Sequence, residues 1–253
     1  MRARRDVATS WERQHDRPFI YAGPAKCADV AAWKQAARAE HAVKSNLVYG
    51  IVLLDLVKAF ERIRHAYLLQ SAIKHAYPLW LLRLSLDTYR IFRAVEVGNA
   101  YSQIVQATRG ITAGSGFATT EMRLAVFTPL KDAHRAHPTV VPTAFVDDIA
   151  CELAATTTLL LTHLVGFVLM VCNALEEAGN EISRRKSICS ASCARVGRGL
   201  QKASNKFEIK FQPRVKSLGT GLAAGAARNV SVLKKRLRDF RARLSRFAML
   251  RAE

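Results

Sequence analysis

Two adjacent carboxylates, Asp147 and Asp148, separate two apolar segments of the sequence. These segments, 139–146 and 149–153, predict two strands joined by a tight hairpin that carries both acids at its tip. Hard divalent cations such as Mg²⁺ prefer carboxylate oxygens as ligands. Asp is also a common turn residue, so in isolation the pair is more often a polar β-turn than a metal site.

A third acid, Asp55, ends the apolar segment 47–54, which has the composition of a strand buried on both faces. In isolation, Asp at this position is more often a helix N-cap. If the strands before Asp55 and Asp147 lie in one sheet and run in the same direction, the two acids meet at one edge. That arrangement suits two-metal phosphoryl transfer, in which one ion activates a 3′-hydroxyl and the other stabilises the leaving pyrophosphate.

The segment 109–116 is rich in glycine and precedes a predicted helix that reaches about residue 134. Glycines allow the backbone to approach a nucleotide or a template strand closely. The segment lacks the Gly-Lys-Ser/Thr ending of a nucleoside triphosphatase P-loop, so that type of site is not supported. A plain turn leading into a helix explains it equally well.

The elements that must position these residues follow from hydrophobic patterning. Helices are predicted over 25–45, 59–76, 78–92 and 156–178, a hairpin about Gly98 and Asn99, and short strands near 187–189 and 207–211. From Val230 onward, apolar residues recur every three or four positions with Lys and Arg between them, which predicts an amphipathic basic helix.

The chain is strongly basic, with 39 Lys and Arg against 20 Asp and Glu and a net charge of +19. An excess of this size favours a polyanionic partner, such as nucleic acid, a membrane surface or an acidic protein. The five cysteines form no Cys-x-x-Cys pair or Cys/His quartet, which argues against zinc and favours a reducing compartment. The most apolar run, 159–172, is too short for a membrane span and predicts a buried core helix.

Taken in order, the motifs resemble those of the reverse transcriptase palm, especially of the non-LTR retrotransposon and group II intron type. Residues 55–61 resemble the motif D-L-x-K-A-F-D, with Glu61 in place of the final Asp. Residues 109–115 resemble the G-x-x-Q-G-S loop, with Ala113 in place of Gln. Residues 145–148 resemble the Y/F-x-D-D hairpin.

The resemblance continues through two further motifs, at 180–187 and at 216–219, where the second is similar to the primer-grip turn. It implies an α+β fold: a palm with an antiparallel sheet backed by helices, followed by a helical thumb-like segment. Residues 1–46 would be partial fingers or an N-terminal extension, 47–220 the palm, and 221–253 the thumb-like segment. The apolar stripe of that last helix would pack inward, with its cations facing a nucleic acid duplex.

The resemblance also implies a role for each matching residue. Metal binding and catalysis would fall to Asp55, Asp147 and Asp148, with Lys186 assisting the leaving group. Nucleotide contacts would come from Lys58, Ala59, Phe60, Gly114 and Ser115, with Phe60 screening the sugar 2′-hydroxyl. Nucleic-acid contacts would come from Arg109, Leu218, Gly219, Lys234, Arg238 and Arg241. Without the motifs, Phe60 would be a core aromatic, and Lys58 and Lys186 solvated charges.

The function expected from the resemblance is RNA-directed DNA synthesis with Mg²⁺ or Mn²⁺, an RNA template, a DNA primer and deoxynucleoside triphosphates, without a membrane. The protein would act inside the cell, in the nucleus if the element is eukaryotic. A remnant that binds nucleic acid without catalysis is the main alternative, and the Gln-to-Ala change at Ala113 is consistent with it. An RNA-dependent RNA polymerase is a third class, against which Phe60 argues.

Overall fold

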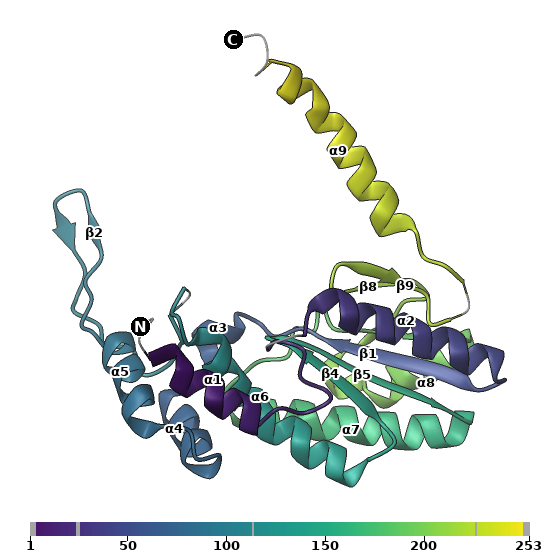
Figure 1. The fold of residues 1–253 in the computed structure, drawn as a ribbon, viewed down its shortest axis with the longest axis horizontal. Coiled ribbons are helices and arrows are strands. Elements are labelled where there is room, and N and C mark those ends of the chain that lie inside the picture. The colour runs from purple at the N-terminus through teal and green to yellow at the C-terminus, as the bar shows by residue number, and fades with distance from the viewer. Residues whose placement is uncertain (1–3, 24–25, 113, 226, 250–253) are drawn as a thin grey trace.

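The computed structural model describes residues 4–23, 26–112, 114–225 and 227–249 and shows an α+β fold (Figure 1). Its centre is a five-stranded sheet with the strand order β4-β5-β1-β6-β7, antiparallel except for the β6–β7 pair. The strands are β1 (Val48–Leu54), β4 (Val141–Phe145), β5 (Asp148–Ala155), β6 (Ile188–Ala191) and β7 (Lys210–Phe211). The predicted antiparallel sheet is therefore confirmed.

Helices cover both faces of this sheet: α6, α7 and α8 lie on one face, and α2 lies on the other (Figure 1). The helices are α1 (Arg5–Gln14), α2 (Ala28–Lys44), α3 (Ala59–Arg62), α4 (His65–Lys74), α5 (Leu79–Tyr89), α6 (Ala118–Ala136), α7 (Thr157–Glu177), α8 (Ala194–Ala203), η2 (Asn205–Phe207, 3₁₀) and α9 (Ser231–Met249). Because α2 packs on β1 and β5, this part of the N-terminal 46 residues belongs structurally to the sheet domain.

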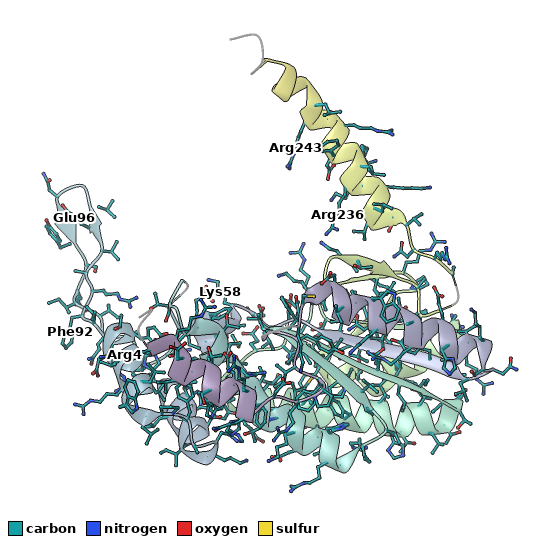
Figure 2. All side chains as sticks on the ribbon, viewed as in Figure 1. Arg4, Lys58, Phe92, Glu96, Arg236 and Arg243 are labelled. Carbon is teal, nitrogen blue, oxygen red and sulfur yellow. The ribbon has the colours of Figure 1, made fainter. Side chains whose placement is uncertain are left out.

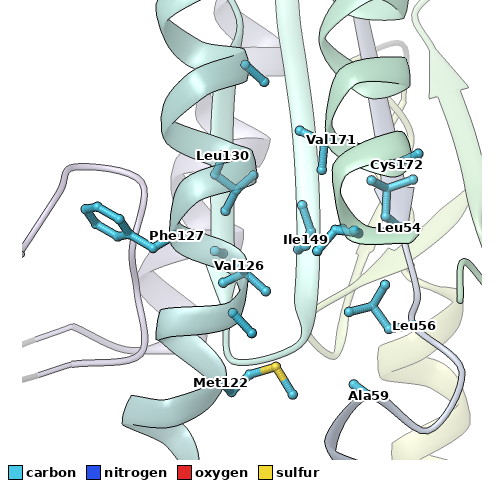
Figure 3. Close-up of a cluster of buried hydrophobic side chains, with 14 of the residues drawn as sticks. Leu54, Leu56, Ala59, Met122, Val126, Phe127, Leu130, Ile149, Val171 and Cys172 are labelled. Atoms are coloured by element: carbon cyan, nitrogen blue, oxygen red, sulfur yellow. The ribbon is translucent and has the colours of Figure 1, made fainter. Parts of the chain in front are cut away.

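Strand β1 alternates between two hydrophobic cores. Tyr49 and Ile51 pack in the core beneath α2, whereas Val52 and Leu54 pack in the core that contains α6 and α7. Successive side chains of a strand point to opposite faces, so β1 is buried on both sides, as its continuous apolar run predicts. Figure 3 shows the second core, where Leu54 and Ile149 lie between α6 and α7.

Helix α7 supplies most of the apolar run 159–172. Of the described helices, it alone is long and apolar enough, by length and composition, to cross a membrane. One side of it is fully buried in the core, including Leu164, Phe167 and Val171, and it packs against α6, α8, β1 and β5. These contacts explain its apolar composition as that of a core helix, as the sequence predicts.

The predicted helix 59–76 is divided into α3 and α4, and the division has a tertiary cause. Arg64 adopts an extended conformation and forms a β-bridge with Arg109, while Ile63 O accepts a hydrogen bond from Gly110 N. Contact with the glycine-rich segment thus competes with helical hydrogen bonds. Helix α8 was not predicted; its glycines, Gly197 and Gly199, are poor helix formers in isolation.

Two segments project from the body (Figure 1). One is an arm that ends in the hairpin of β2 (Glu96–Val97) and β3 (Ala100–Tyr101), and the other is α9, which follows the hairpin of β8 (Val215–Ser217) and β9 (Thr220–Leu222). The prediction that the apolar stripe of α9 packs inward is wrong for the stripe residues whose side chains the structure describes. They remain 45–58% exposed: Val230, Leu233, Leu237, Phe240 and Leu244.

The helix itself is confirmed, but nothing in the described chain covers its apolar stripe. The stripe repeats as in any amphipathic helix, and repetition alone does not reveal whether a partner surface is present in the same chain. The stripe positions 247 and 250 lie outside the described side chains.

Candidate active site

The sheet register brings the three acids together at one edge. Strands β1 and β4 both run antiparallel to β5 and therefore run in the same direction as each other. Leu54 pairs with Ile149, so Asp55, the next residue, stands beside Asp148 on the neighbouring strand. Asp147 lies in the two-residue turn of the β4–β5 hairpin, beside Val146, whose φ of +59° is one that β-branched residues rarely adopt.

The segment 181–187 fixes the backbone of Asp55 from the other side. Asp55 N donates to Ser187 Oγ at 3.1 Å, and Asp55 O accepts from Ser183 N at 2.8 Å. This pairing carries Lys186 to the acids, with its Nζ 3.6 Å from Oδ2 of Asp55. Lys186 thus lies beside Asp55, and its role at the leaving group stays a prediction.

The three acids leave an excess of negative charge at the edge of the sheet. Desolvation raises the pKa of Asp148, and the nearby charges of Asp147 and then Asp55 raise it further, while Lys216 opposes the shift. Oδ2 of Asp55 is buried and accepts no hydrogen bond from the described residues. A cation would relieve both conditions, because it neutralises the cluster and satisfies the free oxygen.

The three acids could therefore bind a cation, but they do not surround it on all sides with protein ligands. Among the described residues, no group of three or more His, Cys, Asp or Glu side chains converges tightly enough to hold a metal ion alone. Mg²⁺ in nucleotidyl-transfer sites is bound by one or two carboxylates together with waters and substrate phosphates. Such an open site matches the separation of Asp55 and Asp148 on two strands.

A cavity of about 570 Å³ opens beside the acids. Its lining includes Asp55, Asp148, Lys186, Lys216, Leu218 and Gly219. Leu218 and Gly219 form the β8–β9 turn, with φ of +46° and +80°, as in a two-residue hairpin of type I′. The structure thus places the predicted primer-grip turn against the acids.

Lys216 is a site residue that sequence reasoning did not assign a role. Its charge opposes the raised pKa of Asp148, and it lines the cavity beside Lys186. The available signal was its place two residues before Leu218, at the start of the motif 216–219. The ammonium groups of Lys186 and Lys216 and the carboxylates of Asp55 and Asp148 therefore line the same cavity. Such a cavity suits an anionic ligand that binds together with a cation.

The glycine-rich segment packs on the chain that follows Asp55. Ile111 N donates to Phe60 O at 2.7 Å, and Gly110 has a φ of +98°. A Cβ atom on Gly110 would lie 3.2 Å from Glu61 O, so glycine permits both the backbone conformation and the close approach. His65 Nε2 contacts Gly110 O at 2.9 Å.

A buried polar network anchors the end of this segment, and no sequence motif signalled it. Glu121 on α6 is fully buried and accepts a hydrogen bond from the Tyr89 hydroxyl at 2.6 Å. Desolvation raises the pKa of Glu121. Desolvation and then the charge of Glu121 raise the pKa of Tyr89, while Ser115 of the glycine-rich segment opposes the shift, so the network borders that segment.

The other predicted nucleotide contacts lie around this segment and do not line the 570 Å³ cavity. Lys58 is exposed, with a left-handed φ of +47°, while Ala59 is buried, so its side chain is closed to a ligand. Phe60 is half-buried and packs against the core, which agrees with its alternative interpretation as a core aromatic residue. Gly114 and Arg109 are exposed, and Ala113 lies outside the described residues.

The predicted nucleic-acid contacts on α9 are exposed to solvent: Lys234, Arg238 and Arg241. Figure 2 shows Arg236 and Arg243 extending from the same helix. The Arg236 guanidinium lies 2.8 Å from the position that a Cβ atom on Gly219 would occupy, so α9 begins close to the turn that borders the cavity.

Comparisons with known proteins agree with the fold. No profile of a known protein family matches the sequence, and no curated protein matches it. Among solved structures, telomerase from Candida tropicalis matches with a TM-score of 0.61, both alone (11% identity) and in complex with a fragment of telomeric RNA (10%). A form truncated from the C-terminal domain matches with a TM-score of 0.53 and 9% identity.

The matches cover 89–91% of this chain but only 37–43% of the telomerase chains. At this level of identity they show the fold and not the activity. They support a reverse transcriptase-like fold broadly, without favouring the non-LTR retrotransposon or group II intron type. The chain shares the fold of these telomerase structures, an α+β palm with a sheet backed by helices and a C-terminal helix.

Proposed function

We propose that this chain is the palm-containing part of an RNA-directed DNA polymerase from a retroelement, which extends a DNA primer on an RNA template. The observation that supports this most directly is the meeting of Asp55, Asp147 and Asp148 at one sheet edge, where desolvation and then the charges of Asp147 and Asp55 raise the pKa of Asp148. A likeness to telomerase, one structure of which contains telomeric RNA, is consistent with a nucleic-acid substrate.

In this proposal the residues of the chain bind and position the reactants. Asp55 and Asp147 hold Mg²⁺ with the support of Asp148, and Lys186 and Lys216 face the phosphates in the cavity. Mg²⁺, when bound, supplies the charge neutralisation that nucleotidyl transfer requires. Leu218 and Gly219 border the place of the primer terminus, and Mn²⁺ can replace Mg²⁺.

The test is extension of an oligo(dT) primer on a poly(A) RNA template with dTTP and Mg²⁺. We expect product from the wild type and a loss of at least a hundredfold for Asp147→Asn, since the site would lose a metal ligand. Asp87→Asn, which removes the same charge from an exposed part of α5, is the matched control and should retain activity. Replacement of dTTP by UTP tests the RNA polymerase alternative.

The second candidate is a nucleic-acid-binding remnant without catalysis. One observation favours it: Ala113 stands where the motif that it resembles has Gln. The remnant predicts binding to primed template with equal affinity for wild type and Asp147→Asn, and no extension by either. Because the chain spans less than half of the telomerase chains, the assay should also include an N-terminally longer form.

A further inference from the structure

A second cavity, of about 700 Å³, lies on the opposite end of β4 from the acids. Val141 and Pro142 at the start of β4 line it, whereas Phe145 at the end of β4 borders the catalytic cavity. At 3.4 Å per residue the two ends are separated by roughly 14 Å. Its lining is formed by Arg17, Pro18, Phe19, Tyr21, Trp33, Lys34, Ala37, Arg38, His134, Val141 and Pro142.

Aromatic rings form much of this lining. Trp33 on α2 is 69% exposed, which is unusual for so large an apolar side chain. Tyr21 is buried beneath Lys34, whose Nζ lies 5.5 Å from the centre of the ring. Phe19 and His134 are in edge contact, with ring centroids 6.0 Å apart. The cavity therefore offers the exposed indole of Trp33 beside buried rings, with the ammonium group of Lys34 over one of them.

The charges of the lining all have one sign. It contains Arg17, Lys34 and Arg38, but no Asp or Glu. Lys34 and Arg17 form no ion pair with any described residue; the Arg17 guanidinium donates to the backbone oxygen of Asp16 and lies 5.5 Å from the centre of the Phe127 ring. Arg38 pairs with buried Glu152, yet its Nε is buried without a hydrogen-bond acceptor in the described chain. The lining is thus complementary to an anion with hydrogen-bond acceptors.

We propose that this cavity binds single-stranded nucleic acid outside the catalytic cleft, with a base stacked on Trp33 and the adjoining phosphates near Lys34 and Arg17. Base–aromatic stacking combined with cations along the backbone is the general mode of single-strand binding. A duplex would not fit, because its bases are already stacked on each other. An acidic peptide would satisfy the cations but would supply no base to stack on the exposed indole of Trp33.

The first experiment follows the fluorescence of Trp33. In a Trp80→Phe variant only Trp33 and Trp11 remain, and Trp11 is buried with 3% exposure. We expect titration with oligo(U) or oligo(dT), without Mg²⁺ or nucleotides, to quench the exposed indole through stacking. The two oligonucleotides distinguish an RNA strand from a DNA strand, and UMP tests whether a free nucleotide suffices. Polyglutamate supplies the negative charge without bases and should not quench.

The second experiment compares affinities of matched variants. Trp33→Ala should weaken oligonucleotide binding by roughly 5- to 150-fold, which corresponds to the stacking of one base. Trp80→Ala, at an exposed tryptophan on α5, should bind as the wild type. Trp33→Phe should recover most of the affinity, and Lys34→Gln should reduce the salt dependence by about one phosphate contact.

Equal affinities of Trp33→Ala and Trp80→Ala would overturn the proposal, as would equal quenching by polyglutamate and oligo(U). Far-ultraviolet circular dichroism of each variant checks the fold, which an exposed substitution should not alter. The binding is independent of catalysis, so Asp147→Asn should retain quenching at Trp33. Loss of extension with retained quenching therefore separates the failure of one proposal from the failure of the other.

Discussion

The ammonium nitrogen of Lys186 lies 3.6 Å from Oδ2 of Asp55, an oxygen that accepts no hydrogen bond from the described residues. The two side chains reach each other because the Asp55 backbone accepts a hydrogen bond from Ser183 N and donates one to Ser187 Oγ. The pair lies at the open side of the acidic cluster, where a phosphate carried by Mg²⁺ would compete with Asp55 for the ammonium group.

Lys186→Gln should lower primer extension by ten- to a hundredfold while leaving the fold intact. The Lys186 side chain is 71% exposed, so its ion pair contributes about 0–1 kcal/mol to stability at most. Lys186→Arg keeps the charge and should retain more activity. Lys44→Gln, at an exposed lysine near the end of α2, is the control. If Lys186→Gln were fully active, the assignment of Lys186 to the leaving group would be wrong.

The acidic cluster should make stability depend on both pH and Mg²⁺. Because the pKa of Asp148 is raised in the folded state, its protonated form favours folding, and this contribution is lost as the pH rises through the raised pKa. Without metal, Asp148→Asn should therefore raise the melting temperature at neutral pH, but have little effect near pH 4.

Mg²⁺ should raise the melting temperature of the wild type at neutral pH, since an ion that binds the folded state stabilises it. The gain should shrink as the pH falls, because protons compete for the same carboxylates. Differential scanning fluorimetry with EDTA, Mg²⁺ or Mn²⁺ measures both effects. A melting temperature that rises equally with Mg²⁺ in wild type and the Asp55→Asn, Asp147→Asn double variant would contradict a metal site here.

Gly110→Ala should destabilise the protein more than Gly98→Ala. Both glycines have positive φ, +98° and +62°, and so both substitutions carry a backbone cost of about 1–2 kcal/mol. Only at Gly110 does the new Cβ approach backbone, at 3.2 Å from Glu61 O, whereas nothing lies within 4 Å at Gly98. Urea denaturation of both variants gives the difference. Equal losses would show that the glycine-rich segment can move away from Glu61 without cost.

Phe167→Ala should destabilise the protein by about 3–5 kcal/mol, because Phe167 of α7 is fully buried and its removal leaves a cavity. Leu159→Ala, on the same helix at 52% exposure, should cost less than about 1 kcal/mol. Urea denaturation in aqueous buffer distinguishes the two. Equal and small losses would indicate that α7 is not a core helix.

Local patterns in the sequence predicted the strand of Asp55, the β4–β5 hairpin and helices α2, α6 and α7, because each has one dominant periodicity. Strand direction predicted that Asp55 and Asp147 reach the same sheet edge, but the register that sets Asp55 beside Asp148 was not predicted. The neighbouring Lys216 was not predicted either, since it comes from a separate two-stranded hairpin. The roles assigned to the site residues remain predictions.

Long-range contacts account for the elements that sequence patterns missed. The break between α3 and α4 depends on Gly110, which lies far along the chain, so no local pattern reveals it. The apolar stripe of α9 predicted packing that the described chain does not supply. The Glu121–Tyr89 network was likewise invisible, because a buried carboxylate on a helix has the same local sequence as an exposed one.

The central position of β1 determines how the acidic cluster responds to partial opening of the molecule. Because β1 is hydrogen-bonded to β5 on one side and β6 on the other, its amide protons should exchange with deuterium only in global unfolding. The hairpin of β2 and β3 pairs with no third strand of the described chain, and its amide protons should exchange faster. Asp55 thus sits at the end of a strand that should stay paired until the whole domain unfolds.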